Sequence, residues 1–221
     1  HPILHMQCGP IRHAIGPSES APGFIRRLVC RETSFRWNGP ADAGIQSIYG
    51  AIEQDDARNM AILDDVIAAV AQGRSPIVLT ERRSHLDHLA SRLEKFVRHL
   101  VVLHGGTGRK EQRAVLERLA SIPEDEERLL LATGRYIGEG FDDARLDTLF
   151  LVMPVSWRGT LVQYAGRLDR PHPNKQEVRI IDYVDRDEPV LAKMFEKRLR
   201  GYRRMGYSVG PTGATARLPG F

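Results

Sequence analysis

The sequence predicts an α/β fold built on one doubly wound parallel sheet. Short, continuously apolar segments recur along the chain, at residues 76–80, 100–104, 129–133, 148–153 and 178–182. Amphipathic segments, with apolar residues three and four positions apart, lie between several of them. This alternation indicates parallel strands that are buried on both faces and joined by crossover helices.

The N-terminal part divides into a linker and two predicted elements. Residues 1–25 are rich in Pro, Gly and Ser, which indicates an irregular linker or the remnant of an upstream domain. Residues 24–37 alternate enough to predict a strand. From Ile45 to Gln72 the apolar spacing is helical, and Gly73 is a suitable C-terminal cap. We expect the domain to span 26–206 and to end in a tail at 207–221.

The strand at 76–80 precedes a predicted helix over 84–97. Ser84 could cap this helix, and its apolar face consists of Leu86, Leu89, Leu93 and Phe96. The same helix carries His85 and His88, which we interpret as part of an exposed face and not as metal ligands.

The remaining elements repeat the strand and helix alternation. A helix is predicted over 110–120 after the strand at 100–104, and a last helix over about 188–205. The last helix carries six basic residues that could attract nucleic acid or contact another domain: Lys193, Lys197, Arg198, Arg200, Arg203 and Arg204. In a doubly wound sheet, ligands bind beyond the carboxyl ends of the strands. We therefore expect the site in the loops after Thr80, His104, Thr133 and Met153.

Composition adds weaker constraints. The 221 residues suffice for one well-buried domain, and the formal net charge of +4 favours an anionic partner such as nucleic acid. The two cysteines fit a reducing compartment, so we expect a cytoplasmic protein. No apolar run reaches the length of about 18 to 20 residues that a membrane helix needs. A chain that opens on His1 is expected to be a fragment.

A glycine-rich loop follows the strand at 129–133. Gly134, Gly138 and Gly140 would let the backbone approach a phosphate or sugar, and Asp142 could accept hydrogen bonds from ribose hydroxyls. A plain structural turn is the alternative interpretation of such glycines. The position of the loop at a strand end favours a functional role.

Residues 163–170, QYAGRLDR, carry a second polar constellation. If this segment is helical, Gln163, Arg167 and Arg170 lie on one face. Two convergent guanidinium groups could grip a polyphosphate and neutralise charge on a transferred phosphoryl group. The alternative is a solvated basic face.

The chain lacks a phosphate-binding loop of the form G-x-x-x-x-G-K-[ST], since it contains no Gly-Lys pair. The closest imitation, GGTGRK at 105–110, has the wrong spacing and is interpreted as a turn. A nucleotide gripped by the two arginines would therefore be held mainly by another domain.

Four segments together resemble superfamily 2 helicases of the DEAD/DEAH type. They are IVLTERRSHLDHLASRL, the HGG of 104–106, ATGRYIGEGFDD and QYAGRLDR, in the order of motifs IV to VI. The chain resembles the second RecA-like lobe of a bacterial helicase, and is also similar to motor subunits of restriction systems. The resemblance runs from about Arg26 to Gly206.

The resemblance implies roles for individual residues. Arg167 and Arg170 would be arginine fingers that reach the γ-phosphate of ATP, and Gln163 would sense the nucleotide. Gly140, Asp142 and Gly166 would line the ATP edge. The residues implied to face a nucleic-acid backbone are Thr80, Arg82, His104, Gly105, Thr133 and Gly134. Asp169 departs from the histidine that is frequent in relatives, and it could pair with a finger arginine and weaken it.

The implied function is that of the second motor lobe of an ATP-dependent helicase or translocase. ATP with Mg²⁺ would be bound mainly by an upstream RecA-like lobe of the same chain. DNA is favoured over RNA, no membrane is involved, no residue is assigned as a metal ligand, and the isolated lobe is expected to be inactive. The alternative is a catalytically silent RecA-like module that binds nucleic acid or a protein.

Overall fold

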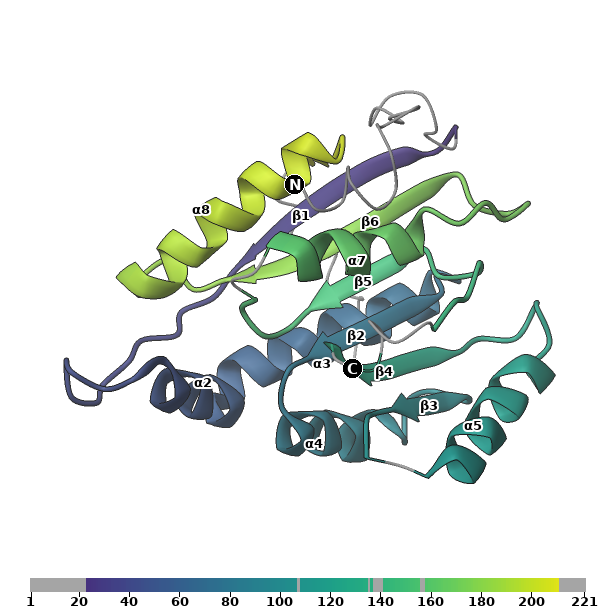
Figure 1. Ribbon diagram of the computed structural model, residues 1–221, viewed down its shortest axis with the longest axis horizontal. Coiled ribbons are helices and arrows are strands. Elements are labelled where there is room, and N and C mark those ends of the chain that lie inside the picture. Colours follow the sequence, from purple (N-terminus) through teal and green to yellow (C-terminus); the bar gives the residue numbers. More distant parts are fainter. Residues whose placement is uncertain (1–22, 107, 135, 137–140, 156–157, 211–221) are drawn as a thin grey trace, which may run out of the picture.

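The computed structural model describes residues 23–210 except 107, 135, 137–140 and 156–157. One sheet of seven strands, in the order β3-β4-β2-β5-β6-β1-β7, runs through the molecule (Figure 1). The strands are β1 (Ile25–Glu32), β2 (Pro76–Thr80), β3 (Leu100–Leu103), β4 (Leu129–Thr133), β5 (Thr148–Leu151), β6 (Glu177–Val184) and β7 (Ser208–Val209). Each neighbouring pair is parallel, which confirms the predicted fold class.

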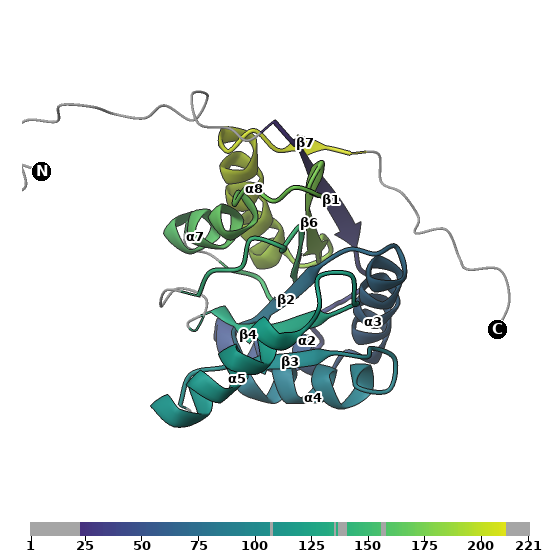
Figure 2. The same cartoon turned by 90° about the vertical axis from the view of Figure 1, so that its right-hand side faces the viewer.

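Helices cover both faces of the sheet. They are α2 (Ile45–Gln54), α3 (Asp56–Ala71), α4 (Arg83–Leu93), α5 (Arg109–Ser121), α7 (Arg158–Leu168) and α8 (Pro189–Arg204). Figure 2 views the sheet from its side, with α7 and α8 on one face and α3 on the other. Alternate strand residues serve the two layers: Leu79 packs in the core under α7 and α8, whereas Val78 packs in the core under α3 and α4.

The helix predicted over 45–72 is two helices, with a break at Asp55. Asp55 has an extended backbone, and its carboxylate accepts a hydrogen bond from the Arg58 amide nitrogen at 2.7 Å. This is the geometry of an N-cap, which begins α3 in a new direction. The helical apolar pattern continues across Asp55, but the capping aspartate ends α2 and begins α3 at this position.

The helix predicted over 84–97 is also shorter than expected. It begins at Arg83 after an Arg82 N-cap that makes no side-chain cap hydrogen bond, so the assignment of Ser84 as the cap was wrong. It ends at Leu93, which leaves Phe96 62% exposed and outside the core. Val97 takes the buried position instead.

The C-terminal end of the sheet lies beyond the predicted domain boundary at Gly206. Ser208 and Val209 form the edge strand β7, which pairs with Arg27 and Leu28 of β1. Gly206, at φ +81°, makes the turn from α8 into this strand.

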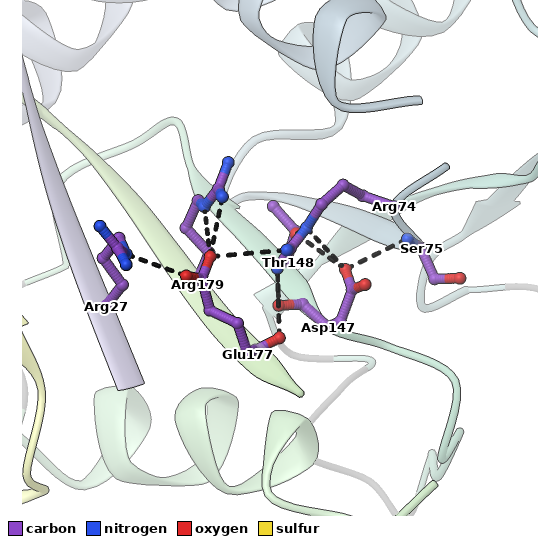
Figure 3. Close-up of polar contacts among 7 residues, drawn as sticks. All are labelled: Arg27, Arg74, Ser75, Asp147, Thr148, Glu177 and Arg179. Carbon is purple, nitrogen blue, oxygen red and sulfur yellow. Dashed lines mark hydrogen bonds and ion pairs between the residues drawn. The ribbon is translucent and has the colours of Figure 1, made fainter. Parts of the chain in front are cut away.

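A network of ion pairs and hydrogen bonds connects the amino ends of β2, β5, β6 and β1, which are consecutive in the sheet (Figure 3). Arg74 donates to the Thr148 hydroxyl at 2.7 Å and to the Asp147 carbonyl at 3.1 Å, and its ion pair with Glu177 measures 3.5 Å. Glu177 also pairs with Arg27 and Arg179. The network joins β1, β5, β6 and the start of β2. Each of its arginines pairs with a carboxylate of the network, so we assign it a structural role.

Candidate functional site

The order of the β-strands brings together, at one edge of the sheet, the residues predicted to contact a nucleic-acid backbone. β3, β4 and β2 are consecutive in the sheet, and all three strands are parallel. Residues that follow them therefore meet at the same carboxyl edge. Thr80 and Thr133 end β2 and β4, Arg82 and Gly134 lie in the segments that follow these two strands, and His104 and Gly105 follow β3.

Thr80 lies inside this edge and not on its surface. Its side chain is 1% exposed, and its hydroxyl lies 3.1 Å from His85 Nδ1. His85 Nε2 lies 3.0 Å from the Asn59 side-chain oxygen, which can only accept. The His85 ring is therefore the Nε2–H tautomer, and Thr80 donates to Nδ1. The Thr80 oxygen also accepts from the Arg82 amide at 3.3 Å, so Thr80 orients the start of the loop.

The interpretation of His85 as part of an exposed helix face was wrong. The side chain is 0% exposed and lies between α3 and the end of β2. Burial, and after it the positive charge of Arg58, lowers the pKa of His85 to about 3. A neutral imidazole at this position supports the loop that carries Arg82.

Arg82 remains partly exposed and is held from one side. Its guanidinium pairs with Glu53 at 2.9 Å and donates to the Gln46 carbonyl at 3.2 Å. Both partners belong to α2, so the first turn of α4 is fixed against α2.

Arg83 was not identified from the sequence, although it lies at the same edge. It pairs with Asp87 at 2.8 Å and donates to His104 Nδ1 at 2.7 Å. Because a guanidinium can only donate, His104 Nδ1 accepts in this contact; the same nitrogen lies 3.1 Å from the Gly105 carbonyl oxygen, to which it would have to donate, so the two hydrogen bonds exclude each other. Arg83 thus links the loop after β2 to the loop after β3. The signal for it was the second arginine of TERR at 80–83.

The two predicted finger arginines belong to different local structures. α7 carries Gln163, which is exposed, and Arg167, which is partly exposed. The helix ends at Leu168, so Arg170 lies in the following turn, and the prediction that both arginines share one helical face was wrong. The Asp169 amide donates to the Gly166 carbonyl at 3.3 Å and closes that turn.

Arg170 is exposed and pairs with Asp142 at 3.0 Å. The pair joins the turn after α7 to the loop after β4, so two predicted nucleotide-facing residues are in direct contact. Lys175 donates to the Leu168 and Arg170 carbonyls at 3.0 and 2.8 Å, which caps the end of α7 and fixes the turn.

The glycines expected at the nucleotide edge differ in their surroundings. Gly140 lies outside the described residues. Gly166 is exposed, and an added Cβ would meet no atom within 4 Å, so nothing in the described part of the lobe requires glycine there. Gly134, by contrast, is enclosed beneath Tyr164 and Glu81. Thr133, at the end of β4, is partly buried.

One basic residue of α8 is buried and cannot attract nucleic acid. The Arg198 side chain donates to both carboxylate oxygens of Asp182, at 2.7 and 2.9 Å, and Tyr202 donates to Asp182 at 2.8 Å. Burial lowers the pKa of Arg198, but the negative charge of Asp182 outweighs it and raises that pKa. The expectation for Arg198 was therefore wrong.

Neither a metal cluster nor a membrane span occurs in the part of the chain that the structure describes. No group of three or more His, Cys, Asp or Glu residues there is arranged to hold a metal ion. No described helix has the length and apolar character needed to cross a bilayer.

The comparison with protein families defines the class of this protein. The family described as "Helicase conserved C-terminal domain" matches residues 58–172, just over half of the chain. The matched region includes α4, α7 and the carboxyl edge described above. The chain belongs to this family.

Individual proteins also resemble the chain. It is 30% identical over 122 residues to the transcript termination protein A18 of Fowlpox virus, a match that covers 54% of this chain and 26% of the relative. It shares its fold with yeast (S. cerevisiae) Dbp5 bound to RNA and ADP BeF3, with a TM-score of 0.61, 13% identity and coverage of 96% of this chain and 48% of that chain.

A third likeness is to a restriction-modification enzyme. The ATP-dependent type ISP restriction-modification enzyme LlaBIII bound to DNA matches with a TM-score of 0.60 and 18% identity. The match covers 91% of this chain and 15% of that enzyme. The chain thus spans less than half of each of these three proteins, and its fold is that of a RecA-like helicase C-terminal lobe.

Proposed function

We propose that the chain is the second motor lobe of an ATP-dependent helicase or translocase, and that a first RecA-like lobe of the same protein completes it. One observation carries the proposal. Residues suited to a nucleic-acid backbone lie at the carboxyl edge of the sheet, and residues suited to a polyphosphate lie on α7 and in the turn after it, in a chain of the helicase C-terminal family.

The donor set near the end of α7 fits the phosphates of ATP. Arg170 is exposed, Arg167 is partly exposed, and the preceding residue, Gly166, leaves open space on the surface of α7. Two guanidinium groups can bind phosphoryl oxygens and stabilise the charge that develops during transfer. We propose that ATP and its Mg²⁺ are bound mainly by the other lobe, since this sequence contains no Gly-Lys pair for a phosphate-binding loop.

The Arg170–Asp142 ion pair sets a requirement for this reaction. Arg170 must leave Asp142 to reach a phosphate, and Asp142 is then available to accept hydrogen bonds from ribose hydroxyls. The pair is about half exposed, so solvent screening keeps the cost of breaking it low. Closure of the lobes would exchange this pair for contacts with ATP.

At the carboxyl edge proposed to contact nucleic acid, hydrogen-bond donors are supplied by Arg82, Arg83 and His104. Gly105 exposes its backbone there. Thr80 acts indirectly, because its buried hydroxyl holds the Arg82 amide. Contacts of this kind address phosphates and not bases, so binding should weaken as salt rises. We propose DNA as the preferred strand. The cytoplasmic location stays a prediction.

The deciding experiment compares the lobe with the full-length protein that contains it. ATPase activity is measured for both, with and without single- and double-stranded DNA and RNA. We expect turnover that nucleic acid stimulates in the full-length protein only, with the largest stimulation by DNA. Turnover by the isolated lobe would contradict the two-lobe mechanism.

A silent binding module is the remaining alternative. It is favoured by the absence of any Gly-Lys pair from this sequence, since the lobe cannot cradle phosphates alone. Nucleic-acid binding by the full-length protein without ATP hydrolysis would establish the module. Stimulation by RNA alone would retain the motor and change its substrate.

A further inference from the structure

A hydrogen bond joins α7, the helix that carries the predicted finger Arg167, to the loop after β2, which is predicted to contact nucleic acid. The Tyr164 hydroxyl donates to Glu81 Oε1 at 3.0 Å. Tyr164 lies on α7, next to Gln163 and one turn before Leu168, where the helix ends. Glu81 directly follows β2 and directly precedes Arg82. The two partners are 83 residues apart in the chain.

The third loop of the site passes beneath this bond. A Cβ added to Gly134 would lie 1.7 Å from the Tyr164 hydroxyl oxygen and 2.4 Å from Glu81 Oε1. No side chain larger than hydrogen fits there unless the bond moves. The loops after β2 and β4 and the helix after β5 therefore meet at one contact.

The two partners of this hydrogen bond differ in burial: Tyr164 is buried, and Glu81 is exposed. Tyr164 is 3% exposed and packs in the core beneath α7. Burial and the neighbouring Glu81 charge raise the pKa of the Tyr164 hydroxyl, so it remains a donor at physiological pH. Glu81 is exposed, and water can solvate its carboxylate when the bond breaks. The fold thus does not need this bond to neutralise a buried charge.

We infer that the Glu81–Tyr164 hydrogen bond couples nucleic-acid binding at the loop after β2 to the position of the finger helix. A bound nucleic-acid strand that moves the loop after β2, which contains Glu81 and Arg82, would move α7 as well, because the hydrogen bond joins Glu81 to Tyr164. A contact couples two sites when its free energy depends on the state of both. Glu81 and Tyr164 are positioning residues in this scheme, and the scheme rests on the proposed motor function.

The test uses the full-length protein with Tyr164→Phe, which removes only the hydroxyl. Tyr207→Phe is the matched control, because Tyr207 is also 3% exposed in the same core and its hydroxyl has no hydrogen-bond partner among the described residues. ATPase rates are measured without nucleic acid and across a titration of single-stranded DNA.

We expect Tyr164→Phe to lower the maximal stimulation by about five-fold or more, the lower range of measured couplings. ATPase activity without DNA and the DNA concentration at half-maximal stimulation should both match those of Tyr207→Phe. A purely structural hydroxyl would not produce this separation. Glu81→Ala, which removes the acceptor at an exposed position, should reproduce the loss, and the double variant should lose no more than either single variant.

Other outcomes identify what fails. Equal stimulation in Tyr164→Phe and Tyr207→Phe overturns the coupling and leaves the motor intact. Losses that add in the double variant overturn it too, as does a higher half-maximal DNA concentration with full maximal stimulation, which would indicate a role in binding. An unmodified protein without any stimulated ATPase activity overturns the proposed function and the coupling together.

Discussion

Arg26 and Asp169 form an ion pair in which Arg26 Nη2 lies 3.2 Å from Asp169 Oδ1. Arg26 belongs to β1, and Asp169 lies in the turn between the two predicted finger arginines. The expectation that Asp169 weakens a finger arginine is therefore replaced by a different role. The pair ties the turn that carries Arg170 to the sheet.

We predict that Asp169→Asn does not raise the ATPase rate of the full-length protein. The substitution removes the Asp169 charge, which forms an ion pair with Arg26 in this structure. It therefore loosens the turn after α7 from β1 and does not free a finger arginine from an inhibitory partner. Steady-state ATPase assays at saturating nucleic acid test this, with Asp187→Asn as the control, because Asp187 forms an exposed pair with Arg36. A faster Asp169→Asn enzyme would restore the inhibitory role.

Arg167→Ala in the full-length protein should lower the stimulated ATPase rate by about 10³ to 10⁵, the range for arginine fingers. The reason is the loss of a positive charge where phosphoryl charge develops. Arg113→Ala is a suitable control, since Arg113 is exposed on α5 and forms an exposed ion pair with its helical neighbour Glu117. An unchanged rate in Arg167→Ala would refute the finger role.

Stability should fall in mild acid because of His85. Its pKa is about 3 when folded and 6.5 ordinarily, so between these values the unfolded chain binds more protons. The free energy of unfolding therefore decreases as pH falls through 6.5, by about 1.4 kcal/mol between pH 7.5 and 5.5 from this residue. Urea unfolding of the chain and of His85→Gln at both pH values measures it. The variant should show a smaller pH dependence; equal dependence in both would contradict the prediction.

The buried Arg198–Asp182 pair should be costly to break. Arg198→Ala leaves the Asp182 carboxylate buried with the Tyr202 hydroxyl as its remaining partner, so we expect a loss of about 3 to 5 kcal/mol in the free energy of unfolding. Arg200→Ala, exposed on the same helix, should change it by less than about 0.5 kcal/mol. Denaturant titration of both variants decides, and equal losses would show that the pair is not the cause.

Gly134→Ala should destabilise the lobe by about 1 to 3 kcal/mol, because the new methyl group collides with the Tyr164 hydroxyl. Gly44→Ala provides the comparison, since an added Cβ there meets no atom within 4 Å. Thermal unfolding of both variants measures the difference. A Gly134→Ala lobe as stable as Gly44→Ala would mean that the contact yields without cost.

Several features of the site followed from the sequence with little ambiguity. The apolar segments predicted the strands, and β4 begins and ends at the expected residues, Leu129 and Thr133. The spacing of QYAGRLDR also predicted a helix with Gln163 and Arg167 on its surface, as α7 has them. The failures were local: a cap at Asp55 divided one helix, and the end of α7 at Leu168 separated Arg170 from Arg167.

The sequence by itself determined the succession of strands and helices along the chain and the parallel class of the sheet, and it predicted that the functional loops follow the carboxyl ends of the strands. These depend on the periods of about 3.6 and 2 residues that decide which side chains can be buried together. Tertiary structure alone decided that Thr80 and His85 face inward, that Asp182 binds Arg198, and that Asp169 pairs with a residue 143 positions away. Partner choice depends on which strands become neighbours, and β6 beside β1 is a long-range outcome that no local pattern encodes.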